Sequence, residues 1–194
     1  MKINEIFYSI QGEGARSGQA SIFIRLTGCD LACGFCDTEF ESGKEMSDEE
    51  LLETISKSFV GGCKWIVWTG GEPTLQLKPE SIAFFKEKGY KQAIETNGNN
   101  SVPEGIDWVA CSPKVAEHIL LRNFPNGVDE LRYVRHKGHM SVPNPKITAK
   151  RKFLSPMFDG DKPNAANILH CTKLVLENPE WELSVQSHKL LKVL

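Results

Sequence analysis

The sequence predicts an α/β fold, a compact and incomplete (β/α) barrel with a largely parallel sheet. Short apolar runs alternate with helical segments along the chain, which is typical of a parallel sheet. The connections are short, and no repeat, low-complexity tract or linker divides the 194 residues, so one domain over 1–194 is expected. That length is short for a full eight-fold barrel of about 250 residues, which favours an incomplete one.

The first elements lie on either side of a cysteine-rich loop. Residues 22–26 (Ile-Phe-Ile-Arg-Leu) predict a strand that runs directly into this loop. Ser47 and Glu50 form a capping box, the signature of a helix N-terminus. The helix that follows has one apolar face, made by Leu51, Ile55 and Phe59. Residues 65–68 then predict a buried strand that ends at Thr69-Gly70-Gly71-Glu72-Pro73.

The rest of the chain repeats this alternation. Helices are expected over 79–88, with Ile82, Phe84 and Phe85 inward, and over 165–177; strands are expected at 92–96, 108–110, 131–134, 152–154 and 182–186. Residues 97–100 are a strong turn signal, and the basic, proline-containing segment 135–151 is expected to be a surface loop. Ligands of parallel α/β sheets gather at the carboxyl ends of the strands, and the candidate motifs here follow predicted strands.

Composition excludes several function classes. With 40% hydrophobic and 25% charged residues, the chain is an ordinary globular protein, and its formal net charge of -2 creates no field that attracts nucleic acid or an anionic membrane. No apolar run approaches the about 20 residues that span a bilayer, and the N-terminus lacks the apolar stretch of a secretory signal. We therefore expect a cytoplasmic protein with reduced thiols that binds neither nucleic acid nor membrane.

Three of the six cysteines, Cys29, Cys33 and Cys36, share one short loop. In a reducing compartment such clustering indicates a metal site rather than disulfides. Three thiolates leave one iron of a 4Fe-4S cluster open to an external ligand, whereas closed structural sites have four protein ligands. A zinc-stabilised loop is the structural alternative. The isolated cysteines are expected to be small core residues: Cys63, Cys111 and Cys171.

The Cys29-x-x-x-Cys33-x-x-Cys36 spacing resembles the signature of the radical S-adenosylmethionine (SAM) superfamily, in which SAM chelates the open iron through its amino and carboxylate groups. Residues 69–73 resemble the second motif of that superfamily, which meets the amino group of SAM. Glycines allow the backbone to approach closely, and the Gly71 carbonyl or the Glu72 carboxylate can accept hydrogen bonds from an ammonium. By itself this motif would be only a turn. Its place after the cysteine loop and a predicted strand favours SAM binding.

Further motifs resemble the 7-carboxy-7-deazaguanine synthase family over nearly the whole chain. They are FYSIQGEG at 7–14, FIRLTGC at 23–29, CDT at 36–38, SPK at 112–114, SPM at 155–157 and LSVQSHK at 183–189. The resemblance implies conversion of 6-carboxy-5,6,7,8-tetrahydropterin into 7-carboxy-7-deazaguanine with loss of ammonia, on the route to queuosine. It also implies a 4Fe-4S cluster, SAM and Mg²⁺ as cofactors, a homodimer, and a reductant of the flavodoxin or ferredoxin type.

The resemblance implies residue roles as well. No side chain is expected to act as an acid or base, because a SAM-derived radical carries the reaction. The Arg25 guanidinium suits a substrate carboxylate, with a surface salt bridge as the alternative, and the Thr38 hydroxyl would meet Mg²⁺. The implied substrate residues are Ile10, Gln11, Gly12, Glu13, Arg25, Thr69, His188 and Leu194; the SAM residues are Phe35, Cys36, Asp37, Gly71, Glu72, Ser112, Pro113, Lys114, Ser155, Pro156, Met157 and Phe158; and the metal ligands are Cys29, Cys33, Cys36 and Thr38.

Four positions depart from the pattern of the family. They are Asp30, where asparagine is common, Phe35, where tryptophan is common, Ser155, where glutamine is common, and Leu194, where proline is frequent. None of these departures removes a cluster ligand.

Two other functions remain open. An activating enzyme that makes a glycyl radical on a partner protein would share the cysteine loop, but it would not need Gln11, Arg25 or His188. A non-catalytic zinc or iron–sulfur binding module is the second alternative, and the motif at 69–73 argues against it. Turnover of the carboxypterin separates these alternatives from the synthase.

Overall fold

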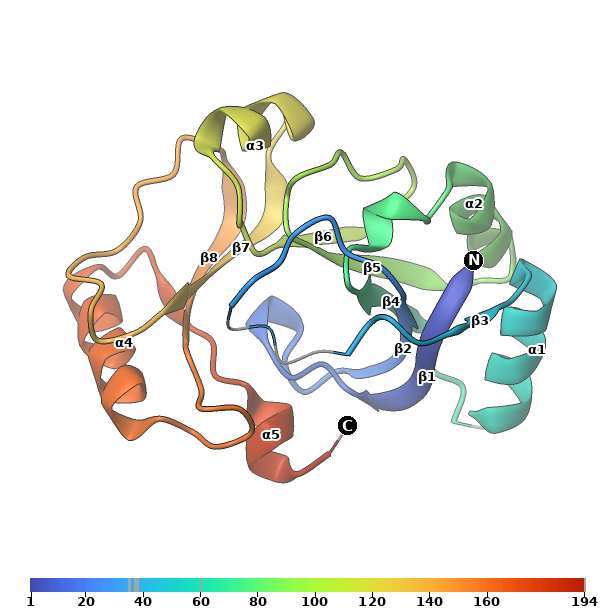
Figure 1. Ribbon diagram of the computed structural model, residues 1–194, viewed down its shortest axis with the longest axis horizontal. Helices are drawn as coiled ribbons and strands as arrows, with labels where there is room; N and C mark the ends of the chain where they lie inside the picture. The colour runs from blue at the N-terminus through green and yellow to red at the C-terminus, as the bar shows by residue number, and fades with distance from the viewer. Residues whose placement is uncertain (35, 37–38, 60, 194) are drawn as a thin grey trace. The chain divides into compact units, whose positions relative to one another are not determined.

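The computed structural model describes residues 1–34, 36, 39–59 and 61–193 (Figure 1). The chain clusters into two compact units: the first comprises Met1–Ser9, Ala20–Thr96 and Asn100–Val109, and the second comprises Ile10–Gln19, Asn97–Asn99 and Ala110–Leu194. The single domain expected over 1–194 stays a prediction.

The first unit is built on a mostly parallel sheet. Its strands are β1 (Lys2–Ile10), β2 (Ala20–Leu26), β3 (Lys44–Glu45), β4 (Trp65–Gly70), β5 (Lys91–Thr96) and the beginning of β6 (Trp108–Cys111), in the order β3-β1-β2-β4-β5-β6. Strand β4 pairs in parallel with β2 and with β5, whereas β3 pairs antiparallel with β1. The register of β2 and β4 places Arg25 opposite Thr69 and Leu26 opposite Gly70.

Two helices cover one face of this sheet, α1 (Asp48–Ser58) and α2 (Pro79–Glu87), and a short 3₁₀ helix, η2 (Pro73–Leu75), follows β4 (Figure 1). Helix α1 begins with the predicted capping box: Glu50 N donates to Ser47 Oγ at 3.2 Å, and Ser47 N donates to the Glu50 carboxylate at 2.8 Å. The core between the helices and the sheet is aliphatic and aromatic; it includes Ile22, Ile24, Leu26, Leu51, Ile55, Ile66, Trp68, Ile82, Phe85 and Ile94.

The opposite face of the same strands carries a second apolar cluster. Phe23 of β2 and Val67 of β4 bury there together with Ala93 and Phe7, and the rings of Phe7 and Phe23 stack with their centroids 4.9 Å apart. Successive residues of a strand point to opposite faces, so the residues two positions farther along β2 and β4 share this face. Those residues are Arg25 and Thr69, which therefore lie next to the apolar cluster on the same face of the sheet.

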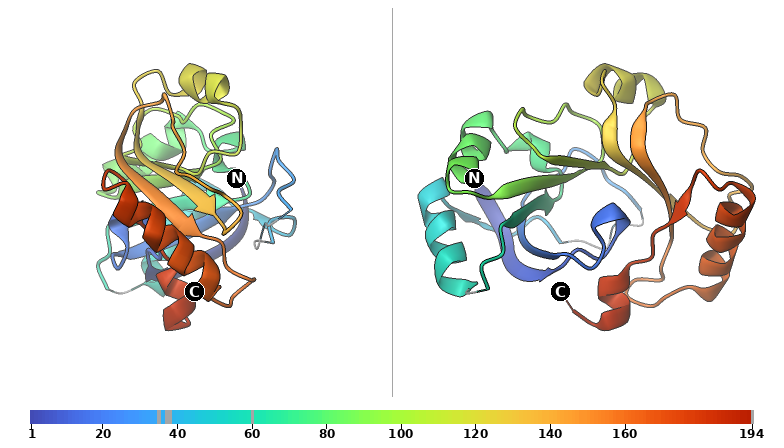
Figure 2. Two further views of the ribbon diagram at one scale, coloured as in Figure 1. Left: turned by 90° about the vertical axis from the view of Figure 1, so that its left-hand side faces the viewer. Right: turned by 180° about the vertical axis from the view of Figure 1, so that it is seen from behind.

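The second unit contains the end of β6, β7 (Val128–Arg135), β8 (Ala149–Pro156) and β9 (Glu182–Leu183), which pair in parallel in that order. Its helices are η1 (Gly14–Arg16), α3 (Glu117–Asn123), α4 (Ala165–Glu177) and α5 (Ser187–Leu191). Helix α4 lies along β8 (Figure 2), and the core between them contains Leu154, Cys171, Leu174 and Trp181.

The expected alternation of strands and helices is confirmed, with small shifts at the ends of elements. The last strand, Glu182–Leu183, is shorter than the predicted 182–186; the next residue, Ser184, donates its backbone N–H to Leu154 O at 3.0 Å and accepts a hydrogen bond from Gly14 N at its hydroxyl at 2.8 Å. The predicted surface loop 135–151 is shorter in the structure and covers 136–148, since β7 continues to Arg135 and β8 begins at Ala149. Strands β1 and β3 and helices α3 and α5 were not predicted. No helix in the described part of the chain is long and apolar enough to cross a membrane.

Candidate functional site

The cysteine loop follows β2 in the first unit. Cys29 and Cys33 are half-buried and Cys36 is exposed, and Cys36 N donates to Cys33 O at 3.1 Å, which closes a turn between them. No disulfide joins any of the six cysteines, all of which lie among the described residues. Burial raises the pKa of the Cys29 thiol, and the nearby carboxylates of Asp30 and Glu72 raise it further, against a hydrogen bond from the Leu31 backbone that lowers it.

The loop fits an iron–sulfur cluster by donor type. Thiolates are the ligands that iron–sulfur clusters prefer, and three of them lie within eight residues. Among the residues that the structure describes, no three Cys, His, Asp or Glu side chains already converge as a metal site. Three predicted residues of this loop, Phe35, Asp37 and Thr38, lie outside the described residues, so their roles and the Mg²⁺ site stay predictions.

The end of β4 is packed against the beginning of the cysteine loop. Gly71 N donates to Leu26 O at 3.2 Å, and Glu72 N donates to Gly28 O at 2.8 Å. A Cβ on Gly71 would lie 2.0 Å from Gly28 O and 3.0 Å from Cys29 Cβ, so no side chain fits at this position. The structure thus brings the two motifs predicted to hold the cluster and SAM into direct contact.

Glu72 is fully buried beside them. Its Oε1 accepts hydrogen bonds from Thr74 N at 3.1 Å, from Thr74 Oγ1 at 2.6 Å and from Thr96 Oγ1 at 2.9 Å. The carboxylate therefore ties the end of β4 to the end of β5. The two acceptors considered for the ammonium of SAM, the Gly71 carbonyl and the Glu72 carboxylate, both stay predictions.

Arg25 and Thr69, two predicted substrate residues, are register partners on adjacent strands, and both are half-buried. The Arg25 guanidinium lies 5.5 Å from the centroid of the Phe7 ring, and its Nε donates to Glu5 Oε2 at 3.3 Å. The salt bridge considered as the alternative is therefore present. This salt bridge engages Nε of the Arg25 guanidinium, and the substrate role of Arg25 stays a prediction.

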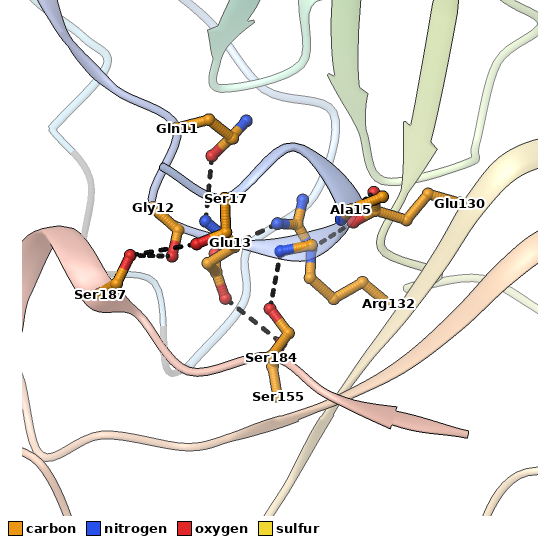
Figure 3. Close-up of polar contacts among 11 residues, drawn as sticks. Gln11, Gly12, Glu13, Ala15, Ser17, Glu130, Arg132, Ser155, Ser184 and Ser187 are labelled. Carbon is orange, nitrogen blue, oxygen red and sulfur yellow. Dashed lines mark hydrogen bonds and ion pairs between the residues drawn. The ribbon is translucent and has the colours of Figure 1, made fainter. Parts of the chain in front are cut away.

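In the second unit, residues 10–15, which include the predicted substrate residues Ile10 to Glu13 and are called the pterin loop below, contact residues 184–188 of the C-terminal tail (Figure 3). The Gly12 carbonyl accepts hydrogen bonds from Ser187 N at 2.9 Å and Ser187 Oγ at 2.8 Å. A Cβ on Gly12 would lie 1.8 Å from His188 Nδ1, so the imidazole occupies the space beside this glycine. Gln11 is buried, and its Oε1 accepts from Glu13 N at 3.2 Å. Gly12 and His188, two predicted substrate residues from opposite ends of the chain, thus lie together.

The predicted SAM residues of the second unit follow β6 and end β8. Ser112, Pro113 and Lys114 are half-buried, and Lys114 N donates to Asn97 O at 3.0 Å. Met157 N donates to Arg135 O at 2.8 Å, and the Pro156 and Phe158 side chains are buried.

Ser155 differs from its neighbours, because its hydroxyl donates to Glu13 Oε1 at 3.2 Å. This predicted SAM residue, which lies on β8, thus contacts the pterin loop. Ile10 ends β1 and is half-buried. Leu194 lies outside the described residues.

Among the described residues, four on β7 and in the C-terminal tail contact the pterin loop and were not predicted as site residues. They are Glu130 and Arg132 of β7, together with Ser184 and Ser187 of the tail. The sequence carried only a partial signal for the first pair. Arg132 lies in the predicted strand 131–134 and Glu130 directly before it; opposite charges two positions apart in a strand lie on the same face and can neutralise each other.

Comparison with known proteins gives a consistent family. Residues 23–119 match the Radical SAM superfamily. A 7-carboxy-7-deazaguanine synthase of Bacteroides thetaiotaomicron is 39% identical over 192 residues, which cover 99% of this chain and 98% of that protein. The synthase of Caulobacter vibrioides is 34% identical over 209 residues, covering 97% of each chain, and that of Haemophilus influenzae is 38% identical over 203 residues, covering 98% of this chain and 93% of that protein.

The crystal structure of QueE from Escherichia coli has the same fold, with a TM-score of 0.72 at 24% identity over 96% of this chain and 94% of that one. The expected fold class, an incomplete (β/α) barrel of the radical SAM type, is therefore confirmed. By sequence, the chain belongs to the radical SAM superfamily and, within it, to the 7-carboxy-7-deazaguanine synthase family.

Proposed function

We propose that this chain converts 6-carboxy-5,6,7,8-tetrahydropterin into 7-carboxy-7-deazaguanine with loss of ammonia. The observation that carries the proposal is the 39% identity, over 99% of the chain, to a protein named for that product. The contact between Gly71 and the Gly28–Cys29 segment supports it, since a radical SAM enzyme needs its SAM motif beside its cluster loop.

The thiolates of Cys29, Cys33 and Cys36 would hold a 4Fe-4S cluster with one iron left for SAM. When bound, these cofactors supply the 5′-deoxyadenosyl radical that takes the C6 hydrogen of the substrate. The protein's part is to bind and orient. The Gly71 carbonyl would accept from the ammonium of SAM, and Glu72 would hold the end of β4 in place through its hydrogen bonds to Thr74 and Thr96.

Each predicted substrate residue is assigned to a part of the pterin by the chemistry of its side chain. The Arg25 guanidinium would bind the carboxylate, with the neighbouring Thr69 hydroxyl as a further donor. Glu13 would accept from the aminopyrimidine N–H groups, and His188 would pack beside Gly12 at the heterocycle. No side chain is assigned a proton-transfer step.

Further properties rest on the resemblance alone. We propose that Thr38 contributes to a Mg²⁺ site together with substrate oxygens, that the enzyme is a cytoplasmic homodimer, and that a flavodoxin- or ferredoxin-type protein supplies the electron.

The test is anaerobic reconstitution with iron and sulfide, followed by incubation with SAM, dithionite, Mg²⁺ and the carboxypterin, with detection by mass spectrometry. Formation of 7-carboxy-7-deazaguanine is the expected result. If 5′-deoxyadenosine forms without that product, the chain acts on another substrate. If neither forms although the cluster is complete, the catalytic proposal fails.

A further inference from the structure

Strand β7 carries two charged side chains that are almost completely buried. Arg132 is 4% exposed and Glu130 is 2% exposed, and the two lie on the same face of the strand, two residues apart. A buried charge is stable only where it is paired and hydrogen-bonded, so the partners of these two groups indicate what the pair is for.

Those partners belong to the pterin loop (Figure 3). Arg132 Nη1 lies 3.5 Å from Glu13 Oε2, while Arg132 Nε lies 3.7 Å from Glu130 Oε1. Glu130 Oε2 in turn accepts a hydrogen bond from Ala15 N at 3.0 Å. The pair therefore holds the loop by one side chain and by one backbone amide.

The loop is shaped to fit the buried pair. Gly14 has a φ of +68°, and a Cβ at that position would lie 1.8 Å from Glu130 Oε1. Glycine is thus required there both for its backbone conformation and for the close approach of the carboxylate. Gly14 N also donates to Ser184 Oγ at 2.8 Å, which fixes the loop from the other side.

Both carboxylate oxygens of Glu13 are held in this arrangement. Ser155 Oγ donates to Oε1 at 3.2 Å, and Arg132 faces Oε2. Glu13 itself remains partly open to solvent, with a side-chain exposure of 22%. A carboxylate that is held at both oxygens but remains partly exposed is preorganised to accept hydrogen bonds from a ligand.

We propose that Arg132 and Glu130 are positioning residues for substrate recognition: through Glu13 and the amide of Ala15, they fix the loop that reads the aminopyrimidine edge of the pterin. The inference rests on the proposed function for the identity of that edge. The chemistry selected is an N–H-rich heterocycle edge. An analogue with oxygen in place of the 2-amino group keeps a ring N–H but loses the amino donors that Glu13 would accept.

The test compares Arg132→Met and Arg132→Lys with a matched control, Arg122→Met. Arg122 belongs to the same unit, is exposed on α3, and its Nε donates to Asn123 Oδ1 at 3.2 Å. For Arg132→Met we expect the KM for the carboxypterin to rise about tenfold or more, with a smaller fall in kcat and an unchanged KM for SAM. The preference for the 2-amino substrate over its 2-oxo analogue should also shrink. Arg132→Lys should recover only part of the loss, because an ammonium cannot span both carboxylates.

A double-mutant cycle with Glu13→Gln separates positioning from general destabilisation. If Arg132 acts through Glu13, the double variant should be no worse than the worse single variant, whereas independent effects would multiply. Multiplying effects, or an unchanged KM for the carboxypterin in Arg132→Met, would overturn the proposal. Should Arg132→Met fail to fold, the same cycle with the conservative Arg132→Lys and Glu13→Gln decides the proposal by the same criterion.

A readout without turnover keeps this proposal distinct from the proposed function. In hydrogen exchange measured by mass spectrometry, the peptide containing Gly14 and Ala15 should lose protection in Arg132→Met and keep it in Arg122→Met. If the wild type makes no 7-carboxy-7-deazaguanine but this difference appears, the function fails and the positioning of the loop stands. Equal exchange in both variants would refute the positioning itself.

Discussion

Gly71 lies so close to Gly28 that a Cβ on Gly71 would be 2.0 Å from the Gly28 carbonyl oxygen. The same oxygen accepts the hydrogen bond of Glu72 N at 2.8 Å. The segment that precedes Cys29 and the segment that ends β4 therefore share one carbonyl group as their point of contact. This explains in physical terms why a glycine stands at position 71.

Replacement of Gly71 by alanine should displace the cysteine loop, because the atom it would meet is backbone and cannot rotate away. We expect Gly71→Ala to lower product formation by about a hundredfold, the cost of a displacement of roughly 1 Å at a reacting centre. The measurement is the rate of 7-carboxy-7-deazaguanine formation per reconstituted cluster. Gly61→Ala is the control, since its Cβ would meet Tyr8 Oη at an ordinary 3.5 Å. A wild-type rate in Gly71→Ala would contradict the required contact.

The buried Glu72 carboxylate should contribute more to stability than a surface glutamate. Glu72→Ala would leave the hydroxyls of Thr74 and Thr96 without their acceptor in a closed environment, at a cost of about 2–4 kcal/mol in the free energy of unfolding. Urea unfolding of the reconstituted protein under anaerobic conditions measures this change. Glu104→Ala, at an exposed turn, should cost less than about 0.5 kcal/mol. Equal costs at the two positions would show that the hydrogen bonds of Glu72 do not stabilise the fold.

The sequence predicted those elements whose apolar pattern is local. Strand β4 is a short apolar run followed by its own turn, and helix α1 has a capping box at its start, so both could be predicted from neighbouring residues. Strand β1 was missed because its apolar residues, Ile3, Ile6, Phe7 and Ile10, have the spacing of a helix. The strand forms because pairing and the stacking of Phe7 on Phe23, which lies on another strand, override that local pattern.

The same distinction applies to the candidate site. The cysteine loop and the glycines of residues 69–73 form contiguous motifs, and the structure brings them together at Gly28 and Gly71. The support behind Glu13 is not contiguous: Ser155 is 142 positions away in the chain, and the Ala15 amide is 115 positions from Glu130. Which distant strand would carry the neutralising charge depends on how β7 and β8 pair, and no local pattern encodes that pairing.

The guanidinium of Arg25 should matter for its shape as well as its charge. Arg25→Lys keeps the positive charge but loses the planar fork that can bind a carboxylate through two N–H groups, so the KM for the carboxypterin should rise about tenfold. Glu5→Gln removes the charge of the partner that Arg25 contacts at 3.3 Å. It should leave the KM within about twofold, because an ion pair whose carboxylate is exposed contributes little. Steady-state kinetics over a range of carboxypterin concentrations measures both values. Equal values for the two variants would indicate that Arg25 serves only the salt bridge.

The thiol of Cys171 should make the protein less stable at alkaline pH. Cys171 lies in the core between α4 and β8, and burial raises its pKa to about 11 from 9.0, although Arg135 opposes part of the shift. The unfolded chain therefore loses this proton near pH 9, while the folded chain keeps it up to about pH 11. Because the folded state binds the extra proton between these two values, its stabilising effect is complete below pH 9 and is lost as the pH rises to 11.

Urea unfolding at several pH values between 8 and 11 should show this as a difference in slope between the wild type and Cys171→Ala. Cys171→Ala also loses packing in the core. That loss lowers the free energy of unfolding by the same amount at every pH, so it does not contribute to the difference in slope. Burial also raises the pKa of Tyr133, to about 12, and this contribution, with its own alkaline loss of stability, is common to both proteins. The free energy of unfolding should therefore fall more steeply with pH in the wild type than in Cys171→Ala. Parallel curves would mean that the Cys171 thiol ionises equally in the folded and unfolded states.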